Sequence, residues 1–72
     1  MAAKKNTDSK ILDAALAMFV ANGYGGTTTR AIAAQAKVNE VTLFRRFGSK
    51  ERLFRAVLAR ETDVQAKTIG LD

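Results

Sequence analysis

The sequence contains no cysteine, histidine, proline or tryptophan. Without cysteine, neither a disulfide nor a thiolate metal site can form, and without histidine a metal ion would have only carboxylate ligands. Two side chains that enzymes use widely in catalysis are therefore missing. No run of apolar residues reaches the ~18 that a membrane span needs. We expect no metal, no cofactor, no enzyme activity and no membrane insertion.

The 72 residues allow one small domain, with no room for a second core. Alanine and leucine are plentiful, and proline, which interrupts helices, is missing. With no disulfide or metal to staple the chain, its stability must come from helix packing. The predicted fold class is therefore all-α, a small helical domain.

The net charge of +5 is unevenly distributed. Residues 30–60 contain eight basic and two acidic residues, so this window carries +6 and the remainder of the chain −1. Such a bias is typical of a domain that binds a polyanion. Charge alone leaves two alternatives open: a solvated basic face without a partner, and a basic helical protein-interaction module that binds an acidic partner.

The N-terminal residues 1–8 are polar and lysine-bearing, which predicts a flexible basic arm. A helix is then predicted from Asp8 or Ser9 to Asn22, because apolar residues recur at i, i+3, i+4 and i+7. Gly23 ends this helix, where a glycine can take the left-handed conformation. The apolar stripe consists of Leu12, Ala15, Leu16 and Phe19, widened by Ile11 and Met18.

Two short helices joined by a tight turn are predicted between residues 27 and 47. The first ends at Ala36 and consists mostly of alanine, whose small side chains let another helix cross closely. A threonine hydroxyl can cap its start by accepting a hydrogen bond from an unpaired backbone N–H. The possible caps are Thr27, Thr28 and Thr29. Lys37 and Val38 make the turn.

The second of these helices begins after Asn39, which is another possible cap. Leu43 and Phe47, at i and i+4, predict its apolar face, whereas Arg45 and Arg46 point elsewhere. A short helix that is apolar on one side and basic on the other, packed on an alanine-rich helix, fits a helix-turn-helix. We expect this helix to be presented to a DNA groove.

Gly48 ends that helix and Ser49 caps a fourth. Its buried face is predicted to be Leu53, Phe54, Val57 and Leu58, with Arg52, Arg55 and Arg60 turned outward. The domain organisation predicted is a flexible basic arm at 1–8, a helix-turn-helix domain at 9–61, and an extension of the fourth helix with a frayed tail at 62–72. The domain would have a three-helix core plus the start of the fourth helix.

Many of these positions form one spaced pattern, which ends in Phe47-x-Ser49-Lys50-Glu51-x-Leu53. Its earlier parts are Ile11-Leu12-x-Ala14-Ala15-x-x-x-Phe19, Gly23-Tyr24, Thr27-Thr28, Ile32-Ala33, Ala36-x-Val38 and Thr42-Leu43-Phe44. Over roughly residues 10–58 the pattern resembles the DNA-binding domain of TetR-type transcriptional regulators. The resemblance implies a homodimer whose larger C-terminal domain binds a small-molecule inducer, a domain that is absent from this sequence.

Three positions depart from the family pattern. Lys37 stands where the turn usually has glycine, at a cost of roughly 1 kcal/mol if the residue is left-handed. Val41 replaces a glycine early in the reading helix, and its side chain could touch a thymine methyl group. Phe44 replaces a tyrosine that often meets phosphate, so a hydroxyl contact is lost there.

By position, the resemblance implies two sets of DNA contacts. The base-reading candidates are Asn39, Glu40, Val41, Thr42 and Arg45. The phosphate candidates are Thr28, Thr29, Arg30, Phe44, Arg46 and Lys50. Arg45 can pair with guanine, and Glu40 could accept a hydrogen bond from cytosine N4. Structural roles stay open as well, with Asn39 as a cap and Glu40 as a complement to the helix dipole.

We therefore expect sequence-specific binding to double-stranded DNA by a transcriptional regulator, a repressor that occupies a palindromic operator. The full-length protein is expected to be a homodimer. This chain offers no large apolar patch and should be a monomer or weak dimer. An inducer would act only through the missing domain. The expected location is cytoplasmic and associated with the nucleoid.

Overall fold

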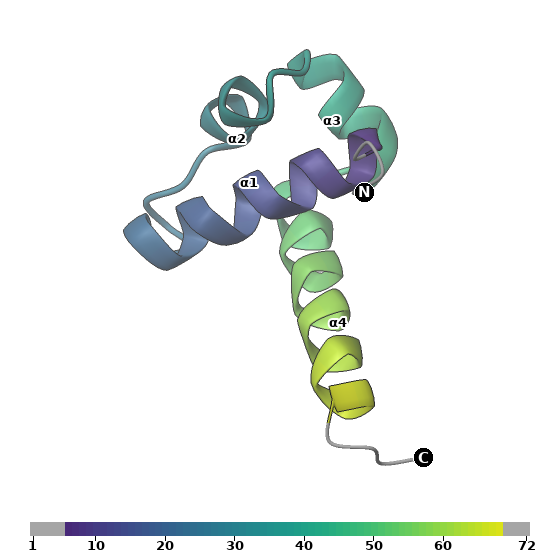
Figure 1. Ribbon diagram of the computed structural model, residues 1–72. Coiled ribbons are helices and arrows are strands. Elements are labelled where there is room, and N and C mark those ends of the chain that lie inside the picture. Colours follow the sequence, from purple (N-terminus) through teal and green to yellow (C-terminus); the bar gives the residue numbers. More distant parts are fainter. Residues whose placement is uncertain (1–5, 69–72) are drawn as a thin grey trace.

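Four helices make up the described part of the fold. The structure, a computed structural model, describes the backbone of residues 6–68 and the side chains of residues 6–62. The helices are α1 (Thr7–Asn22), α2 (Thr29–Ala36), α3 (Glu40–Phe47) and α4 (Lys50–Thr68) (Figure 1). No strand occurs in this described part of the chain, and none of its helices is long and apolar enough to cross a membrane. The predicted all-α class is confirmed.

The start of α1 lies slightly before the predicted start, because Asn6 caps the helix. Asn6 Oδ1 accepts a hydrogen bond from the backbone N–H of Ser9 at 2.7 Å. Thr7 and Asp8, which the sequence placed in the arm, are thus helical, and residues 1–5 of that arm lie outside the described residues. At the other end Gly23 has the expected positive φ of 78°, but its ψ of 168° differs from the left-handed helical value.

One apolar core joins all four helices. Its buried members are Ile11, Ala14, Ala15 and Phe19 of α1, Ile32, Ala33 and Ala36 of α2, Leu43 of α3, and Leu53 and Val57 of α4. The α1 stripe was predicted on the correct side, but its centre is rotated: Leu12 and Leu16 are only partly buried, whereas Ala14 is buried. Alanines at the α1–α2 contact keep these two helices close together.

Two predictions for α4 are wrong. Leu58, expected in the buried face, is 50% exposed. Arg60, expected to point outward, donates a hydrogen bond from Nη1 to Asp13 Oδ1 of α1 at 2.9 Å. The buried line of α4 runs through Leu53 and Val57, so residue 60, three positions after Val57, lies on the buried side and residue 58 does not. α4 continues to Thr68, and residues 69–72 of the predicted tail lie outside the described residues.

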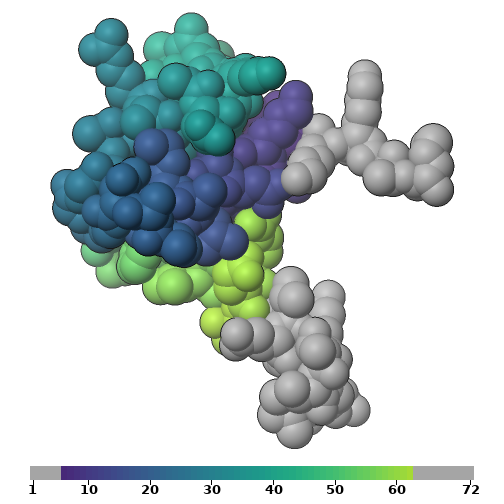
Figure 2. All heavy atoms as spheres, turned by 60° about the vertical axis from the view of Figure 1, so that its left-hand side comes forward, coloured from purple at the N-terminus to yellow at the C-terminus, as the bar shows by residue number. Residues whose placement is uncertain are grey.

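The helices are arranged around α1, which crosses the middle of the molecule (Figure 1). α2 and α3 lie together on one side of α1, and α4 extends away on the other. The space-filling view shows the same division, with α2 and α3 in teal above α1 and α4 in green below it (Figure 2). The two helices of the predicted helix-turn-helix are therefore accessible on a side that α4 does not cover.

Candidate nucleic-acid interface

The three threonines before α2 have different roles. Thr28 is the cap, because its Oγ1 accepts a hydrogen bond from the backbone N–H of Ala31 at 3.1 Å. Thr27 is 1% exposed, and its hydroxyl lies 3.0 Å from the Met18 carbonyl oxygen and 2.8 Å from that of Gly23. Thr27 thereby ties the start of α2 to the end of α1, and it leaves Thr28 exposed at the entrance of α2.

The turn between α2 and α3 contains a left-handed residue that is not glycine. Lys37 adopts the left-handed conformation, with φ 61° and ψ 42°. Its N–H donates to Ala34 O at 3.1 Å, and the N–H of Val38 donates to Ala33 O at 3.0 Å. This pair of hydrogen bonds is the Schellman motif, which satisfies the last carbonyls of a helix. Lys37 therefore carries the cost of roughly 1 kcal/mol that is expected for a left-handed residue other than glycine.

α3 starts and ends as predicted. Asn39 Oδ1 accepts a hydrogen bond from the Val41 N–H at 2.8 Å, which confirms the cap. Gly48 ends the helix at φ 90°, and Ser49 Oγ accepts from the Arg52 N–H at 3.1 Å at the start of α4. Both ends of α3 are thus determined by residues next to it.

The outward face of α3 follows from the direction of its buried face. Leu43 is fully buried and Phe47 packs partly against the core. With about 100° of rotation per residue, Arg45 points directly away from that buried side. By the same rotation Val41 lies about 40° from Arg45 around the helix axis and Phe44 about 100° from it on the same side, and all three side chains are exposed. Thr42 lies at the edge of this face and is half-buried.

Glu40 faces α2 rather than the outward side. Its Oε2 accepts a hydrogen bond from the hydroxyl of Thr29 at 2.8 Å. A predicted base reader and a predicted phosphate contact are thus bonded to each other, and their hydrogen bond joins the first residues of the two short helices. The structure gives this pair a bracing role that the sequence did not indicate.

Arg46 faces the start of α1. Its Nε lies 3.4 Å from Asp8 Oδ1, and the two side chains remain 53% and 47% exposed. The buried Oδ1 atom of Asp8 has no hydrogen-bond partner, so this contact is an ion pair only. Sequence reasoning missed Asp8, because no spacing signal links it to a residue so far along the chain.

Lys50 reaches from the start of α4 to the glycine-rich connector between α1 and α2. Its Nζ donates to Tyr24 O at 2.9 Å and to Thr27 O at 3.0 Å, and it lies 4.2 Å from the centroid of the Tyr24 ring. The Tyr24 ring itself stacks on Phe19 of α1 at a centroid distance of 5.7 Å. The Lys50 ammonium therefore bonds the connector within the domain and also lies near the start of α2, where a phosphate contact was predicted.

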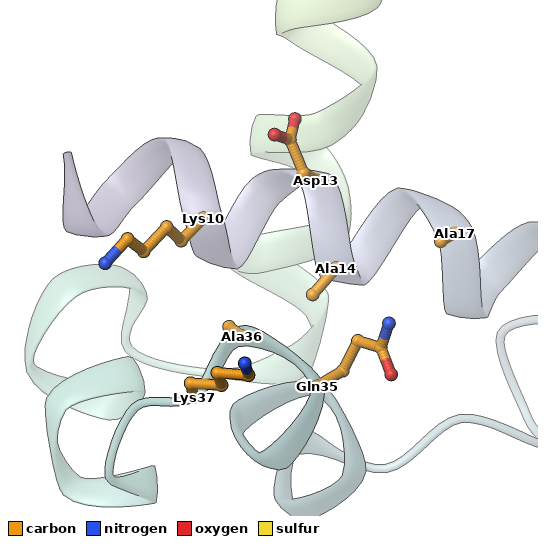
Figure 3. A pocket seen from close by; sticks show the side chains of 7 residues that line it. All are labelled: Lys10, Asp13, Ala14, Ala17, Gln35, Ala36 and Lys37. Atoms are coloured by element: carbon orange, nitrogen blue, oxygen red, sulfur yellow. The ribbon is translucent and has the colours of Figure 1, made fainter. Parts of the chain in front are cut away.

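A groove of about 340 Å³ runs along the surface where α1 meets the end of α2 (Figure 3). Alanine side chains from both helices line it, together with Asp13 and Gln35, and Lys10 and Lys37 stand on either side. None of the predicted DNA contacts lines this groove.

Arg30, the remaining phosphate candidate, is exposed in the first turn of α2. The predicted contacts thus gather on α3, at the start of α2 and at the start of α4.

The capped α2, the left-handed turn and the basic outward face of α3 together define a helix-turn-helix domain of the DNA-binding class. The chain belongs to the tetR family of bacterial regulatory proteins. The sequence pattern described as "Bacterial regulatory proteins, tetR family" matches residues 11–57. The resemblance seen in the sequence is confirmed.

Several relatives are named as transcriptional regulators. The chain is 45% identical over 56 residues to the transcriptional regulator YvkB of Bacillus subtilis. The aligned residues make up 78% of this chain and 30% of YvkB. It is 44% identical over 59 residues to the transcriptional repressor KstR of Rhodococcus jostii, which covers 82% of this chain and 28% of KstR. For KstR of Mycolicibacterium smegmatis the identity is 40% over 67 residues, covering 92% and 33%. The chain spans about a third or less of the length of these relatives.

Proposed function

We propose that α3 enters the major groove of double-stranded DNA, reads base edges and, by occupying an operator, represses transcription. The observation that carries this proposal is the exposure of Arg45 on the side of α3 opposite the buried Leu43. A guanidinium in that position can donate two hydrogen bonds to N7 and O6 of guanine. Asn39, Val41 and Thr42 are the other members of the predicted base-reading set that can join Arg45, whereas Glu40 is bonded to Thr29 on α2.

Phosphate contacts on either side of α3 would hold the helix in the groove. At the start of α2, exposed Thr28 and Arg30 lie beside backbone N–H groups and the positive end of the helix dipole. Arg46 and Lys50 are the cations on the other flank, and Thr29 and Phe44 complete the predicted set. The hydroxyl and cationic members of this set would position the domain without reading sequence.

The rest of the proposal concerns the longer protein. The resemblance to the family supports a homodimeric regulator with a palindromic operator and an inducer that acts through a separate C-terminal domain. Relatives about three times as long as the region they share with this chain fit such an architecture. The same proposal places the regulator in the cytoplasm with the nucleoid, where its operator lies. It includes no enzyme activity, which is supported by relatives that are named as regulators.

Selection of duplexes from a random pool by the 72-residue chain tests this proposal. We expect the pool to converge on one short half-site. Binding to it should weaken with salt, with a slope of log K against log salt of about −2 to −4 for two to four neutralised phosphates. A scrambled duplex of equal composition is the control.

The rival function is binding to an acidic protein partner. If the pool does not converge, and the chain binds a polyglutamate peptide as tightly as any duplex, the DNA-binding proposal is wrong. Convergence on a sequence would instead exclude a purely electrostatic attraction, because a phosphate backbone carries no sequence information.

A further inference from the structure

Two exposed apolar side chains lie on the outward face of α3. Val41 is 57% exposed and Phe44 is 42% exposed. They are three residues apart, so they lie on the same side of the helix and about 4.5 Å apart along its axis. Exposure of these apolar side chains to water is unfavourable, and burying them against a partner would lower the free energy. A pair of this kind beside a cation is a candidate binding surface.

The polar groups next to this pair restrict what it can bind. Arg45 follows Phe44 and lies one turn after Val41, so a cation projects beside the two apolar groups. Glu40, the one acidic residue of α3, is directed to Thr29 on α2 by the 2.8 Å hydrogen bond. The outward face therefore combines a guanidinium with two apolar contacts, and its partner must offer acceptors and apolar groups side by side.

The major groove of DNA offers that combination. Guanine presents two acceptors, N7 and O6, and the apolar group on base edges is the C5-methyl of thymine. The same methyl group occurs on 5-methylcytosine. Base pairs repeat every ~3.4 Å along the duplex, so side chains about 4.5 Å apart can meet groups one or two steps from each other.

We propose that Val41 and Phe44 are specificity-determining residues that each contact the C5-methyl group of a pyrimidine, one or two steps from a guanine bonded by Arg45. This inference rests on the proposed function, in which α3 enters the major groove. It assigns Phe44 an apolar base contact, for which its ring is suited and which needs no hydroxyl group. It also predicts the chemistry of the half-site: a guanine with methyl-bearing pyrimidines beside it.

Replacement of thymine by uracil in the selected duplex is the direct test, because uracil lacks only the C5-methyl group. The affinity of the chain is measured by fluorescence anisotropy after each single replacement, on either strand. At two positions we expect uracil to weaken binding about fourfold, the effect of losing one buried methyl. Replacement at other thymines should leave the affinity unchanged.

Two variants assign each methyl contact to its side chain. Val41→Ala should lose the preference for thymine over uracil at one of the two positions and keep it at the other, and Phe44→Ala should show the reverse pattern. Val20→Ala removes a side chain that is 77% exposed on α1 and should keep both preferences. Thermal melting by circular dichroism shows whether each variant is folded.

The source of the methyl group is identified by the selected sequence. A thymine at the two positions makes thymine the source. If cytosine is selected there instead, and C5-methylation raises affinity about fourfold, 5-methylcytosine is the source and the proposal also stands. Two results would overturn the methyl contacts and leave DNA binding intact. In the first, the chain binds a selected duplex but uracil weakens binding at no position. In the second, uracil weakens binding at the same positions and by the same factor in both alanine variants. Failure to select any duplex would instead overturn the proposed function.

Discussion

Lys37 shows what one residue contributes to the geometry of this interface. A left-handed backbone brings the Cβ atom of any residue except glycine close to the next carbonyl oxygen. The turn keeps this conformation because the Schellman hydrogen bonds to Ala33 and Ala34 hold it. The direction of α3 therefore depends on a strained position, and the strain is measurable.

We expect Lys37→Gly to raise the free energy of unfolding by about 1 kcal/mol. Removing the strain returns about 1–2 kcal/mol, of which the greater freedom of glycine in the unfolded chain cancels about 0.4–1 kcal/mol. Lys37→Ala is the matched control, since it removes the charge and keeps the strain. Urea denaturation measures both, and an equal gain in the two variants would assign the effect to the charge instead.

Arg45 is the residue whose loss should change which sequence is bound. Arg45→Ala is expected to cost ~1–3 kcal/mol on the selected duplex and far less on random DNA, with reduced discrimination at a single base pair. Titration of all single-base variants of the half-site measures this. Arg52→Ala, which removes an equal charge from α4, is the control. A uniform loss across every duplex would show that Arg45 lies along the backbone.

At the scale of the elements, side-chain bonds between helices set the positions of the phosphate and base candidates. Lys50 joins α4 to the connector through Tyr24 and Thr27, and Thr29 joins α2 to α3 through Glu40. Arg46 is paired with Asp8 of α1. Each of these groups would meet DNA from a position that the neighbouring helix determines.

Lys50 should affect stability and affinity together. Its ammonium has three N–H donors, two of which bond carbonyls, so one remains for a phosphate. Lys50→Met should lower the free energy of unfolding by about 1 kcal/mol and weaken binding to all duplexes by a similar factor. Lys50→Gln, which keeps a donor but no charge, should lose affinity with a smaller loss of stability. A changed sequence preference in either variant would contradict a phosphate role.

The Thr29–Glu40 hydrogen bond is suited to a double-mutant cycle. Thr29→Val and Glu40→Met, alone and combined, should show a coupling free energy of about 1 kcal/mol in urea unfolding, because the bond joins a hydroxyl to a carboxylate in a half-buried site and neither replacement can form it. The expected sign is that the double variant loses less than the sum of the single ones. Strict additivity would mean that the bond does not brace the two helices.

At the scale of the whole molecule, the basic residues outnumber the acidic ones where α2, α3 and the start of α4 meet. Asp8 and Asp13 of α1 face arginines of α3 and α4, so part of the acidic charge is used inside the domain. The domain therefore approaches DNA as a cation whose core is shared by all four helices, and no single helix is expected to bind by itself.

The 72-residue chain should be a monomer or a weak dimer in solution. Most of its large apolar side chains are buried or half-buried within the described residues, which leaves little surface for a stable dimer. Sedimentation at micromolar concentration measures this state. On a palindromic duplex two copies should still bind, with their reading helices about one helical turn apart. A dimer that persists at all concentrations would contradict this expectation.

The sequence by itself determined the local features, because they depend on residues within about four positions. The caps at Asn39 and Ser49, the end of α3 at Gly48 and the spaced family pattern were readable without coordinates, whereas the sequence left three threonines as possible caps of α2 and the structure selected Thr28. Only the tertiary structure decided which side chains pair across helices. Glu40 with Thr29, Arg46 with Asp8, and Lys50 with Tyr24 depend on how the helices cross, and so does the exposure of Leu58. Helical periodicity specifies which residues share a face, but the facing partner is set by the packing of the complete core.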